Sequence, residues 1–385
     1  MKPTKKQLAV IGCGGRLSSV LSQIFYLEQP VEVTAILDHN PDYSRQCLAK
    51  HNISTEAIRY YTTEEEFWAN EHPDGILIGT NCNSHAYYAE QVLKRGIPLF
   101  LEKPVGINEE DLARLEPYAA TNTTTVVSFP LRVTELCQQA KKILDSGVLG
   151  KISQVQAVNN VPYGRGYFKK WYRNDSITGG LFLQKATHDI DTILYLLGDK
   201  VPSSVIGVST KNILVGDRPA GLRCHDCEDY LTCPESTYVL TKFCNEPEQP
   251  DTCSFAVDTG NEDSGTMILM FPDGMHAVYT QNFVARKEAG KRMVRIIGMN
   301  ATLEFNFVTG VLTLYHHYKD SVETYTAKSA GGHFGGDHLL ARSYLSLLNE
   351  GKPVLTGTLA DGVLSAKICL LAKRSAEQGG TPHFL

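Results

Sequence analysis

The segment "QLAVIGCGGRLSSVLSQIF" at residues 7–25 combines an apolar run, a cluster of glycines and a second apolar pattern. The run at 8–11 predicts a strand, and the helical spacing of apolar residues over 17–24 predicts a helix. Three glycines lie between these elements: Gly12, Gly14 and Gly15. They permit a tight turn that brings the backbone close to a pyrophosphate at the positive end of the helix. The fingerprint is incomplete, because Leu17 occupies the position of the usual third glycine.

A second predicted strand, "VEVTAILD" at 31–38, ends in Asp38. Asp38 follows the glycines at close to the spacing expected for a ribose-binding acidic residue. Such a residue accepts a hydrogen bond from the adenosine ribose and repels a 2'-phosphate. The pattern therefore predicts NAD rather than NADP. Strand patterns then alternate with helix patterns: strands at 75–80, 97–104 and 124–130, and helices at 84–96 and 109–120. Such alternation predicts an α/β fold with a doubly wound parallel sheet.

One of these strands, "LFLEKPVG" at 99–106, runs from apolar residues directly into Glu102, Lys103 and Pro104. A charge pair before a proline is also an ordinary exit into a solvated loop. Open α/β sheets, however, bind ligands just outside the carboxyl ends of their strands. Once the parallel sheet is predicted, Lys103 is expected at that edge, beside the place where a nicotinamide would reach.

Composition limits the class of protein. A chain of 385 residues predicts two domains. With 42% hydrophobic and 21% charged residues it is expected to be soluble and globular. A net charge of -5 and a pI near 6.2 provide no basic field for nucleic acid or an anionic membrane. The N-terminal lysines lead straight into a strand, and no apolar stretch approaches ~20 residues, so we expect a cytoplasmic protein with mostly reduced cysteines.

The sequence resembles the Gfo/Idh/MocA oxidoreductases along its whole length. Within "TNCNSH", Asn81 and Cys82 depart from the T-P-N-x-x-H pattern of the family, whereas Thr80 and His85 fit it. The matching features are the glycine turn at 12–17, Asp38, "TNCNSH" at 80–85, E-K-P at 102–104, "FPLRV" around Arg132, the pair Gly179 and Gly180, "HDID" at 188–191, and "GGHFGGDHLL" at 331–340. The combination of E-K-P with the distant H-x-x-D is the most specific of these.

The resemblance implies an NAD-binding Rossmann domain at residues 1–129 and a substrate-binding and oligomerisation domain at 130–385. The second domain is expected to be α+β, with a large, mostly antiparallel open sheet, which also agrees with its run of adjacent strand patterns. It would include a cysteine-rich insert at about 216–253 and C-terminal helices at about 336–378. The implied contacts of NAD are Gly12, Gly14, Gly15, Arg16, Leu17, Asp38, Thr80, Asn81, His85, Glu102 and Lys103.

The implied activity is hydride transfer between NAD and a secondary hydroxyl of a sugar, glycoside or cyclitol, in a homodimer or homotetramer. Two alternatives are redox-assisted glycoside cleavage with recycled NAD and a non-catalytic NAD-binding regulator. The resemblance also implies that Lys103 and His188 meet in the active site. A histidine, with an ordinary pKa near ~6.5, can accept the hydroxyl proton, and a lysine can hold the hydroxyl and offset the oxyanion. The aromatic and basic segment at 163–173 is expected to contact the sugar.

One position departs from the D-x-x-x-H pattern of many relatives, because Gln184 stands where they have the aspartate. Read as a helix, the segment places Lys185, His188, Thr192 and Tyr195 on one face. A lysine near His188 would disfavour the imidazolium form. Lys185 is therefore the third predicted catalytic residue.

Cysteines are concentrated in "CHDCEDYLTCP", and this cluster predicts a thiolate metal site, most simply structural zinc. Cys253 is favoured as the fourth ligand because some family members have a similar insert, and Cys244 and His225 are alternatives. Free thiols in a flexible insert are the competing interpretation. The predicted ligands are Cys224, Cys227, Cys233 and Cys253.

Overall fold

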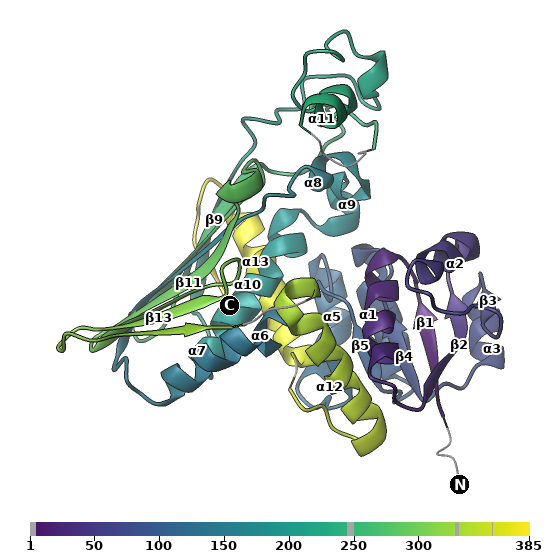
Figure 1. Cartoon of the computed structure of the whole chain (residues 1–385), viewed down its shortest axis with the longest axis horizontal. Helices are drawn as coiled ribbons and strands as arrows, with labels where there is room; N and C mark the ends of the chain where they lie inside the picture. The colour runs from purple at the N-terminus through teal and green to yellow at the C-terminus, as the bar shows by residue number, and fades with distance from the viewer. Residues whose placement is uncertain (1–4, 245–249, 328–330, 356) are drawn as a thin grey trace. The chain divides into compact units, whose positions relative to one another are not determined.

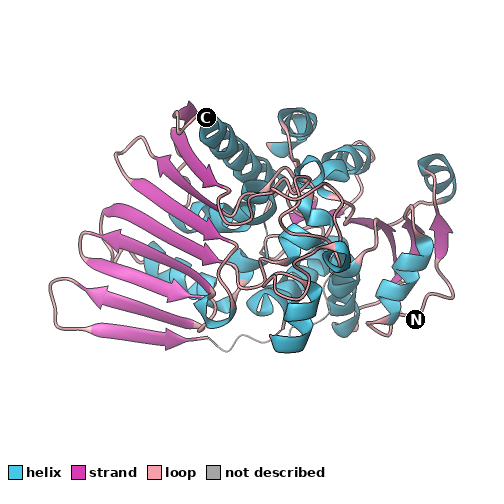
Figure 2. Ribbon diagram, turned by 90° about the horizontal axis from the view of Figure 1, so that it is seen from above, coloured by secondary structure: helices cyan, strands magenta, loops and turns pink. Residues whose placement is uncertain are grey.

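The structure is a computed structural model that describes residues 5–244, 250–327, 331–355 and 357–385. It consists of two compact units, each made of several segments of the chain. The first unit comprises Met1–Ile143, Thr187–Gly198 and Ala327–Lys367, and the second comprises Leu144–Ala186, Asp199–Thr326 and Ile368–Leu385. Each unit has its own sheet, and the two sheets differ in strand direction (Figures 1 and 2).

The first unit contains a parallel six-stranded sheet in the order β3-β2-β1-β4-β5-β6. The strands are β1 (Lys6–Ile11), β2 (Val31–Leu37), β3 (Arg59–Tyr61), β4 (Gly75–Ile78), β5 (Leu99–Leu101) and β6 (Thr125–Val127). The strand order reverses between β1 and β4, and doubly wound sheets bind ligands beyond the carboxyl ends of strands at such a point. The predicted doubly wound parallel sheet is confirmed.

Two helices of the first unit begin at an asparagine that caps them. The Asn40 side chain accepts a hydrogen bond from the Tyr43 amide at the start of α2, and Asn108 caps α5 in the same way through Asp111. The helices are α1 (Gly15–Tyr26), α2 (Pro41–Ala49), α3 (Glu64–Asn70), α4 (His85–Leu93), α5 (Glu109–Ala119), α6 (Pro130–Val133), α10 (Thr187–Leu197) and α12 (Gly336–Glu350). Two further helices, α7 (Glu135–Asp145) and α13 (Leu359–Glu377), each contribute residues to both units.

The core of the first unit is completed by α12, which lies beside α1 (Figure 1). Tyr344 of α12 is fully buried, and its hydroxyl donates to the carbonyl of Ile76 at 3.0 Å. Its ring meets that of Phe100 edge-on, with centroids 5.7 Å apart. Each large apolar side chain buried in this way contributes about 1.5–3 kcal/mol. Segments from far beyond residue 129 are thus part of the same hydrophobic core as β1 and α1.

The second unit contains a nine-stranded sheet in the order β14-β13-β12-β11-β7-β10-β9-β8-β15 (Figure 2). The strands are β7 (Ile152–Asn160), β8 (Ser204–Thr210), β9 (Ser264–Met270), β10 (His276–Asn282), β11 (Lys291–Gly298), β12 (Ala301–Asn306), β13 (Val311–His316), β14 (Val322–Thr326) and β15 (His383–Phe384). Within the described residues β7 and β10 pair in parallel, and the remaining neighbours are antiparallel. The predicted mostly antiparallel sheet is confirmed.

Alternate residues of β9, β10 and β11 are buried, so one face of this sheet packs against other parts of the unit. The part of α13 that belongs to the second unit lies on it closely. A Cβ at Gly207 would be 2.0 Å from the carbonyl oxygen of Ala372, and the Gly207 amide donates to Ser375 Oγ at 2.8 Å. Glycine is therefore required where helix and strand approach.

Short helices of the unit are α8 (Gly166–Lys169), α9 (Asp175–Thr178) and α11 (Thr237–Phe243). None of the helices within the described residues has both the length and the apolar character needed to cross a membrane.

Candidate active site

The turn between β1 and α1 depends on glycine. Gly12 has a φ of 75°, and a Cβ there would lie 2.6 Å from Cγ2 of Thr80, so both the backbone and the space exclude a side chain. Around Gly15 a Cβ would meet no heavy atom within 4 Å. No side chain among the described residues caps α1 at Gly14. This end of α1 therefore presents backbone N–H groups and a positive dipole to an anion such as a pyrophosphate.

Leu17, at the position of the missing third glycine, is fully buried. It packs against Gly79 immediately after β4, where a Cβ would lie 2.9 Å from the Leu17 Cβ. The third glycine of the fingerprint serves close packing of helix on sheet. Here the small residue is on the strand side of the contact, so the leucine side chain fits. The sequence motif looked incomplete because its compensating residue is 62 positions away, at Gly79.

Asp38 follows β2, and its carboxylate fastens the glycine turn to the end of that strand. Its Oδ2 accepts from the Cys13 amide at 2.8 Å and from Ser44 Oγ at 2.9 Å, and its Oδ1 accepts from the Asn40 amide at 2.8 Å. Because two carboxylate oxygens offer about four acceptor sites, one remains for a further donor. Burial and the neighbouring Asp38 charge raise the pKa of the Cys13 thiol to about 12, which keeps that thiol neutral.

His85 begins α4 and joins the loops after β4 and β5. Its Nδ1 lies 2.7 Å from the Pro104 carbonyl oxygen, and its Nε2 lies 3.1 Å from that of Thr80. Burial lowers the pKa of His85, and the charge of Lys103 adds to this effect. The neutral ring has one N–H, which the shorter distance assigns to Nδ1 as a donor to Pro104. His85, predicted as a cofactor contact, thus holds the loop that carries Lys103, while the neighbouring Asn81 is exposed.

Lys103 lies at the carboxyl end of β5, in a partly buried position after Glu102. The Glu102 amide donates to the carbonyl of Ile78 at 3.1 Å, which extends the pairing of β4 with β5 into the motif. Burial raises the pKa of the Cys82 thiol to about 11, and the nearby Lys103 charge opposes that rise. Lys103 therefore sits beside the loop after β4, at the sheet edge where the sequence places it.

Arg16, in the first turn of α1, connects the E-K-P loop to the start of α12. Its Nε donates to Glu102 Oε1 at 2.8 Å, and its Nη2 lies 2.9 Å from Asp337 Oδ1 and 3.0 Å from Ser128 Oγ. Both carboxylates are buried. Burial alone would raise the pKa of Asp337, but hydrogen bonds and charges from His333 and Arg16 lower it well below its usual range. Arg16 and Glu102, both predicted as cofactor contacts, therefore form an ion pair with each other.

His188 lies on α10 and is 3% exposed. Its ring centroid is 6.2 Å from that of Phe129 and 5.7 Å from that of His333. Its carbonyl oxygen accepts a hydrogen bond from Thr192 Oγ1 at 2.8 Å, one turn further along the helix. The predicted base is therefore close to a second histidine, His333, which was not among the predicted site residues. That histidine lies in "GGHFGGDHLL", the segment that carried part of the resemblance.

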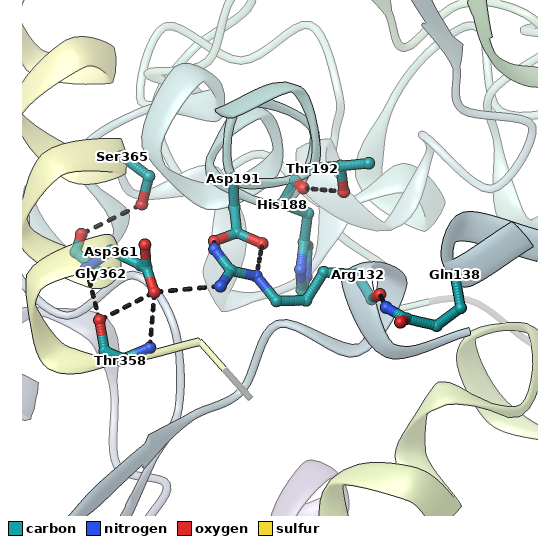
Figure 3. A network of polar contacts seen from close by, with 9 residues as sticks. All are labelled: Arg132, Gln138, His188, Asp191, Thr192, Thr358, Asp361, Gly362 and Ser365. Atoms are coloured by element: carbon teal, nitrogen blue, oxygen red, sulfur yellow. Dashed lines mark hydrogen bonds and ion pairs between the residues drawn. The ribbon is translucent and has the colours of Figure 1, made fainter. Parts of the chain in front are cut away.

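The aspartate of "HDID" anchors α10 through a buried arginine (Figure 3). Arg132 Nε donates to Asp191 Oδ2 at 2.9 Å, Nη2 pairs with Asp191 Oδ1, and Nη1 donates to Asp361 Oδ2 at 3.0 Å. Burial raises the pKa of Asp191 to about 7 although Arg132 opposes it. Burial would also raise that of Asp361, but Arg132 and hydrogen bonds from Thr358 lower it. Asp191 thus fixes the helix that carries His188.

Lys185 belongs to the second unit and is not on the α-helix that carries His188. Phe182–Ala186 form a π-helical turn, and α10 begins only at Thr187. The predicted common α-helical face of Lys185 and His188 is wrong, because a π-turn rotates successive side chains by a smaller angle. Lys185 is buried, and its Nζ donates to the Tyr163 hydroxyl at 2.6 Å and lies 5.4 Å from the ring centre of Tyr167.

The predicted zinc site is not supported. Among the residues that the structure describes, no group of three or more Cys, His, Asp or Glu side chains is arranged to hold a metal. Burial raises the pKa of Cys233 and of Cys253, and the neighbouring Cys224 thiol adds to both shifts. Cys224 Sγ lies 3.4 Å from Nζ of the buried Lys169, so a cation is already beside it. Cys227 is a free thiol as well, Cys244 also carries no disulfide, and His225 pairs with Asp251.

The structure therefore links several predicted residues within the first unit. Arg16 contacts Glu102, which precedes Lys103, and it also contacts Asp337, which pairs with His333. His333 in turn lies beside His188. Arg132, Asp191, His333 and Asp337 lie within motifs of the sequence, but no pattern in the sequence predicts their partners.

Comparisons with known proteins agree with this fold. The model of an oxidoreductase family with an NAD-binding Rossmann fold matches residues 6–129, and that of the GFO/IDH/MocA C-terminal domain matches 137–304. A candidate oxidoreductase of Bacillus subtilis (strain 168), YteT, is 23% identical over 80% of this chain and 81% of its own. Myo-inositol 2-dehydrogenase of Thermotoga maritima (strain ATCC 43589 / DSM 3109 / JCM 10099 / NBRC 100826 / MSB8) is 22% identical over 51% of this chain, which spans only 56% of that protein.

A solved structure of levoglucosan dehydrogenase in complex with NADH and levoglucosan has a TM-score of 0.77 to this chain. The match covers 99% of both chains at 16% sequence identity. At that identity the likeness establishes a shared fold over both units.

Proposed function

The chain belongs to the GFO/IDH/MocA family of oxidoreductases, and from this premise we propose that it transfers a hydride between NAD and a secondary hydroxyl or ketone of a sugar, glycoside or cyclitol. The observation that carries the proposal is the Arg16-centred network. It joins the glycine turn, the loop of Lys103 and the His333 segment beside His188. The homodimer or homotetramer stays a prediction.

The residues at the sheet edge fit NAD. Gly12 and Gly15 leave the backbone of the turn accessible to a pyrophosphate, and α1 starts without a side-chain cap among the described residues. Asp38 has acceptor capacity left for a ribose hydroxyl, and its charge would oppose a 2'-phosphate. When bound, NAD supplies the hydride acceptor.

The protein's own residues would manage the proton and the charge on oxygen. As the substrate's C–H hydride leaves for the nicotinamide, its O–H proton passes to His188 and a C=O bond forms. Lys103 binds the same oxygen and offsets the negative charge that develops on it. The alcohol would lose two electrons and two hydrogens, one as the hydride that bound NAD would accept and one as the proton that would leave through His188.

Lys185 and Tyr163 are proposed to form a hydroxyl-binding pair within the second unit. Although buried, Lys185 keeps its charge. Burial would lower its pKa, but Tyr167 and Tyr163 raise it above the ordinary value. Tyr163 is 60% exposed, whereas Lys185 is 5% exposed. A hydroxyl that reaches this pair would meet an aromatic face and a charged donor, which suits a sugar.

The proposal is tested by following NADH absorbance with NAD and a panel of inositols, hexoses, sugar acids and glycosides. We expect one class to support turnover and Lys103→Ala to lower kcat/KM by at least about 100-fold, because it removes a charge at the developing oxyanion. Lys94→Ala is the matched control, since Lys94 is an exposed residue of the same unit that pairs with Glu90. It should behave as wild type.

The outcomes separate the candidate activities. Release of an aglycone without net NADH would favour glycoside cleavage with recycled NAD. Tight NAD binding with no reaction across the panel would favour a regulator. NADH formation that survives Lys103→Ala unchanged would contradict the assignment of Lys103.

Cofactor preference is expected to depend on the Asp38 charge. Asp38→Asn keeps an oxygen that can accept from the Cys13 amide but removes the charge that repels a 2'-phosphate. The ratio of kcat/KM for NAD to that for NADP should fall about tenfold, which corresponds to ~1.4 kcal/mol. The measurement is initial rates with both cofactors. Asp42→Asn, on a side chain that is 87% exposed, is the control. An unchanged ratio in Asp38→Asn would refute the role of Asp38.

A further inference from the structure

The segment before α12 holds a histidine in an unusual backbone conformation. His333 and Phe334 have φ values of 47° and 58°, and they lie between Gly331 at 90° and Gly335 at 87°. Two successive non-glycine residues in the left-handed region are unfavourable. Such strain is kept where surrounding contacts hold it, commonly at functional sites. Here it accompanies a specific set of contacts around the His333 ring.

The His333 ring is oriented by Asp337. Its Nδ1 lies 3.1 Å from Asp337 Oδ1 and 3.0 Å from Oδ2, and Arg16 holds the same carboxylate. Gly332 is required beside it, because a Cβ there would lie 2.4 Å from Asp337 Oδ2. An Nδ1–H that donates to a carboxylate leaves Nε2 of the neutral ring as an acceptor. The carboxylate also stabilises the ring when it is protonated, as in other Asp–His pairs.

The two histidines differ in access to water. His188 is 3% exposed, whereas the His333 side chain is 31% exposed. Their ring centroids are 5.7 Å apart, with planes tilted by 43°. The two rings are therefore neighbours, and proton transfer between them requires ring nitrogens within hydrogen-bond reach or joined by one water. Among the described residues, two charged groups face His333: Asp337 on α12, and Arg16 on α1, whose Nη1 lies 3.5 Å from the same Nδ1. Their opposite charges are paired with each other.

We propose that His333 is a proton-relay residue that takes the proton from His188 and delivers it to solvent. The inference rests on the proposed dehydrogenase function. After the substrate hydroxyl has given its proton to His188, that proton moves to Nε2 of His333, with Asp337 facing the resulting imidazolium. Water then removes it, so His188 is neutral again for the next turnover. In the reduction of a ketone the same path would run in reverse.

His333→Asn tests the relay. Asparagine tolerates the left-handed backbone, and its amide can still donate to Asp337. We expect kcat for oxidation to fall at least about tenfold with KM and NAD affinity nearly unchanged, and added imidazole to restore part of the rate. His338→Asn is the matched control, because that ring packs against Tyr26, 5.7 Å between centroids, and should leave kcat unchanged. A wild-type kcat, or a loss that neither imidazole nor concentrated buffer restores, would overturn the relay.

A second readout needs no substrate and therefore separates this inference from the proposed function. In NMR titrations of the full chain labelled at histidine, His188 and His333 should titrate as a coupled pair. His333→Asn should shift the titration of His188, and His338→Asn should not. An unchanged His188 titration in His333→Asn would refute the pair whether or not the protein oxidises any sugar. A shifted titration without any turnover would leave the pair standing and reject the dehydrogenase.

Discussion

Replacing His188 with glutamine is expected to lower kcat by about 100- to 10,000-fold, the range for loss of a positioned general base. Glutamine fills much of the space of the buried ring but cannot accept the substrate proton at neutral pH. The affinity for NAD should change little, because the residues proposed to hold the cofactor are at the ends of β1, β2, β4 and β5, whereas His188 lies on α10. The loss should therefore fall on kcat and kcat/KM together.

The measurement is steady-state kinetics on the best substrate of the panel, with NAD affinity from quenching of protein fluorescence. Melting curves establish that the variant is folded. His72→Gln, at an exposed position after α3, is the matched control and should keep wild-type kcat. If His188→Gln retains wild-type turnover, another group takes the proton. If it loses NAD binding instead, His188 has a structural rather than a chemical role.

Replacing Arg132 with alanine is expected to lower the free energy of unfolding by about 3–5 kcal/mol, because removal of one member of a buried ion pair leaves the other without compensation. The Asp191 side chain is fully buried, and Arg132 provides its two charged hydrogen bonds. Since Asp191 lies on α10, three residues after His188, the variant should also lose activity. Figure 3 shows the arginine between the two carboxylates.

The defect in Arg132→Ala should depend on pH in a defined direction. Burial raises the pKa of Asp191 above the ordinary value of an aspartate, so the folded state binds a proton more readily than the unfolded state. Stability from such a group is greatest at low pH and declines as pH rises through the folded-state pKa. Without Arg132 this pKa rises further, so wild type and variant should lose stability alike below the wild-type pKa of about 7, and the difference between them should grow as pH rises above it.

Urea unfolding followed by circular dichroism at several pH values measures this difference. Lys5→Ala is the control. Lys5 pairs with Glu32, and the two side chains are 59% and 43% exposed. Ion pairs at the surface contribute little to the free energy of unfolding. Adding Asp191→Ala to Arg132→Ala should recover part of the lost stability, since the uncompensated charge is removed. A loss in Arg132→Ala no larger than that in Lys5→Ala, or one independent of pH, would contradict the account.

Sequence reasoning succeeded where the physical cause is local. The Gly12 turn, the strand that ends at Asp38 and the capped start of α5 follow from backbone freedom, alternation and side-chain capping over a few residues. The position of Lys103 at a sheet edge followed from the strand that precedes it. The predicted α-helix over Lys185 was wrong. Similar sequences form π-turns and α-helices, which differ in whether the backbone hydrogen bond spans five residues or four. The predicted zinc site is not supported among the described residues, and the spacing of cysteines in a sequence does not reveal that Lys169 lies beside Cys224.

By itself the sequence determined the class of fold, the cofactor-binding turn and the family, since these depend on periodic patterns and short motifs. Only the tertiary structure decided which charges meet. Arg16 reaches His333 across 317 positions, and Arg132 reaches Asp191 across 59. Because α12 packs in the core of the first unit, His333 and Asp337 lie at the start of α1. Such pairings arise from the burial of apolar faces that carry the charged side chains with them, and no pattern within a single segment specifies their partners.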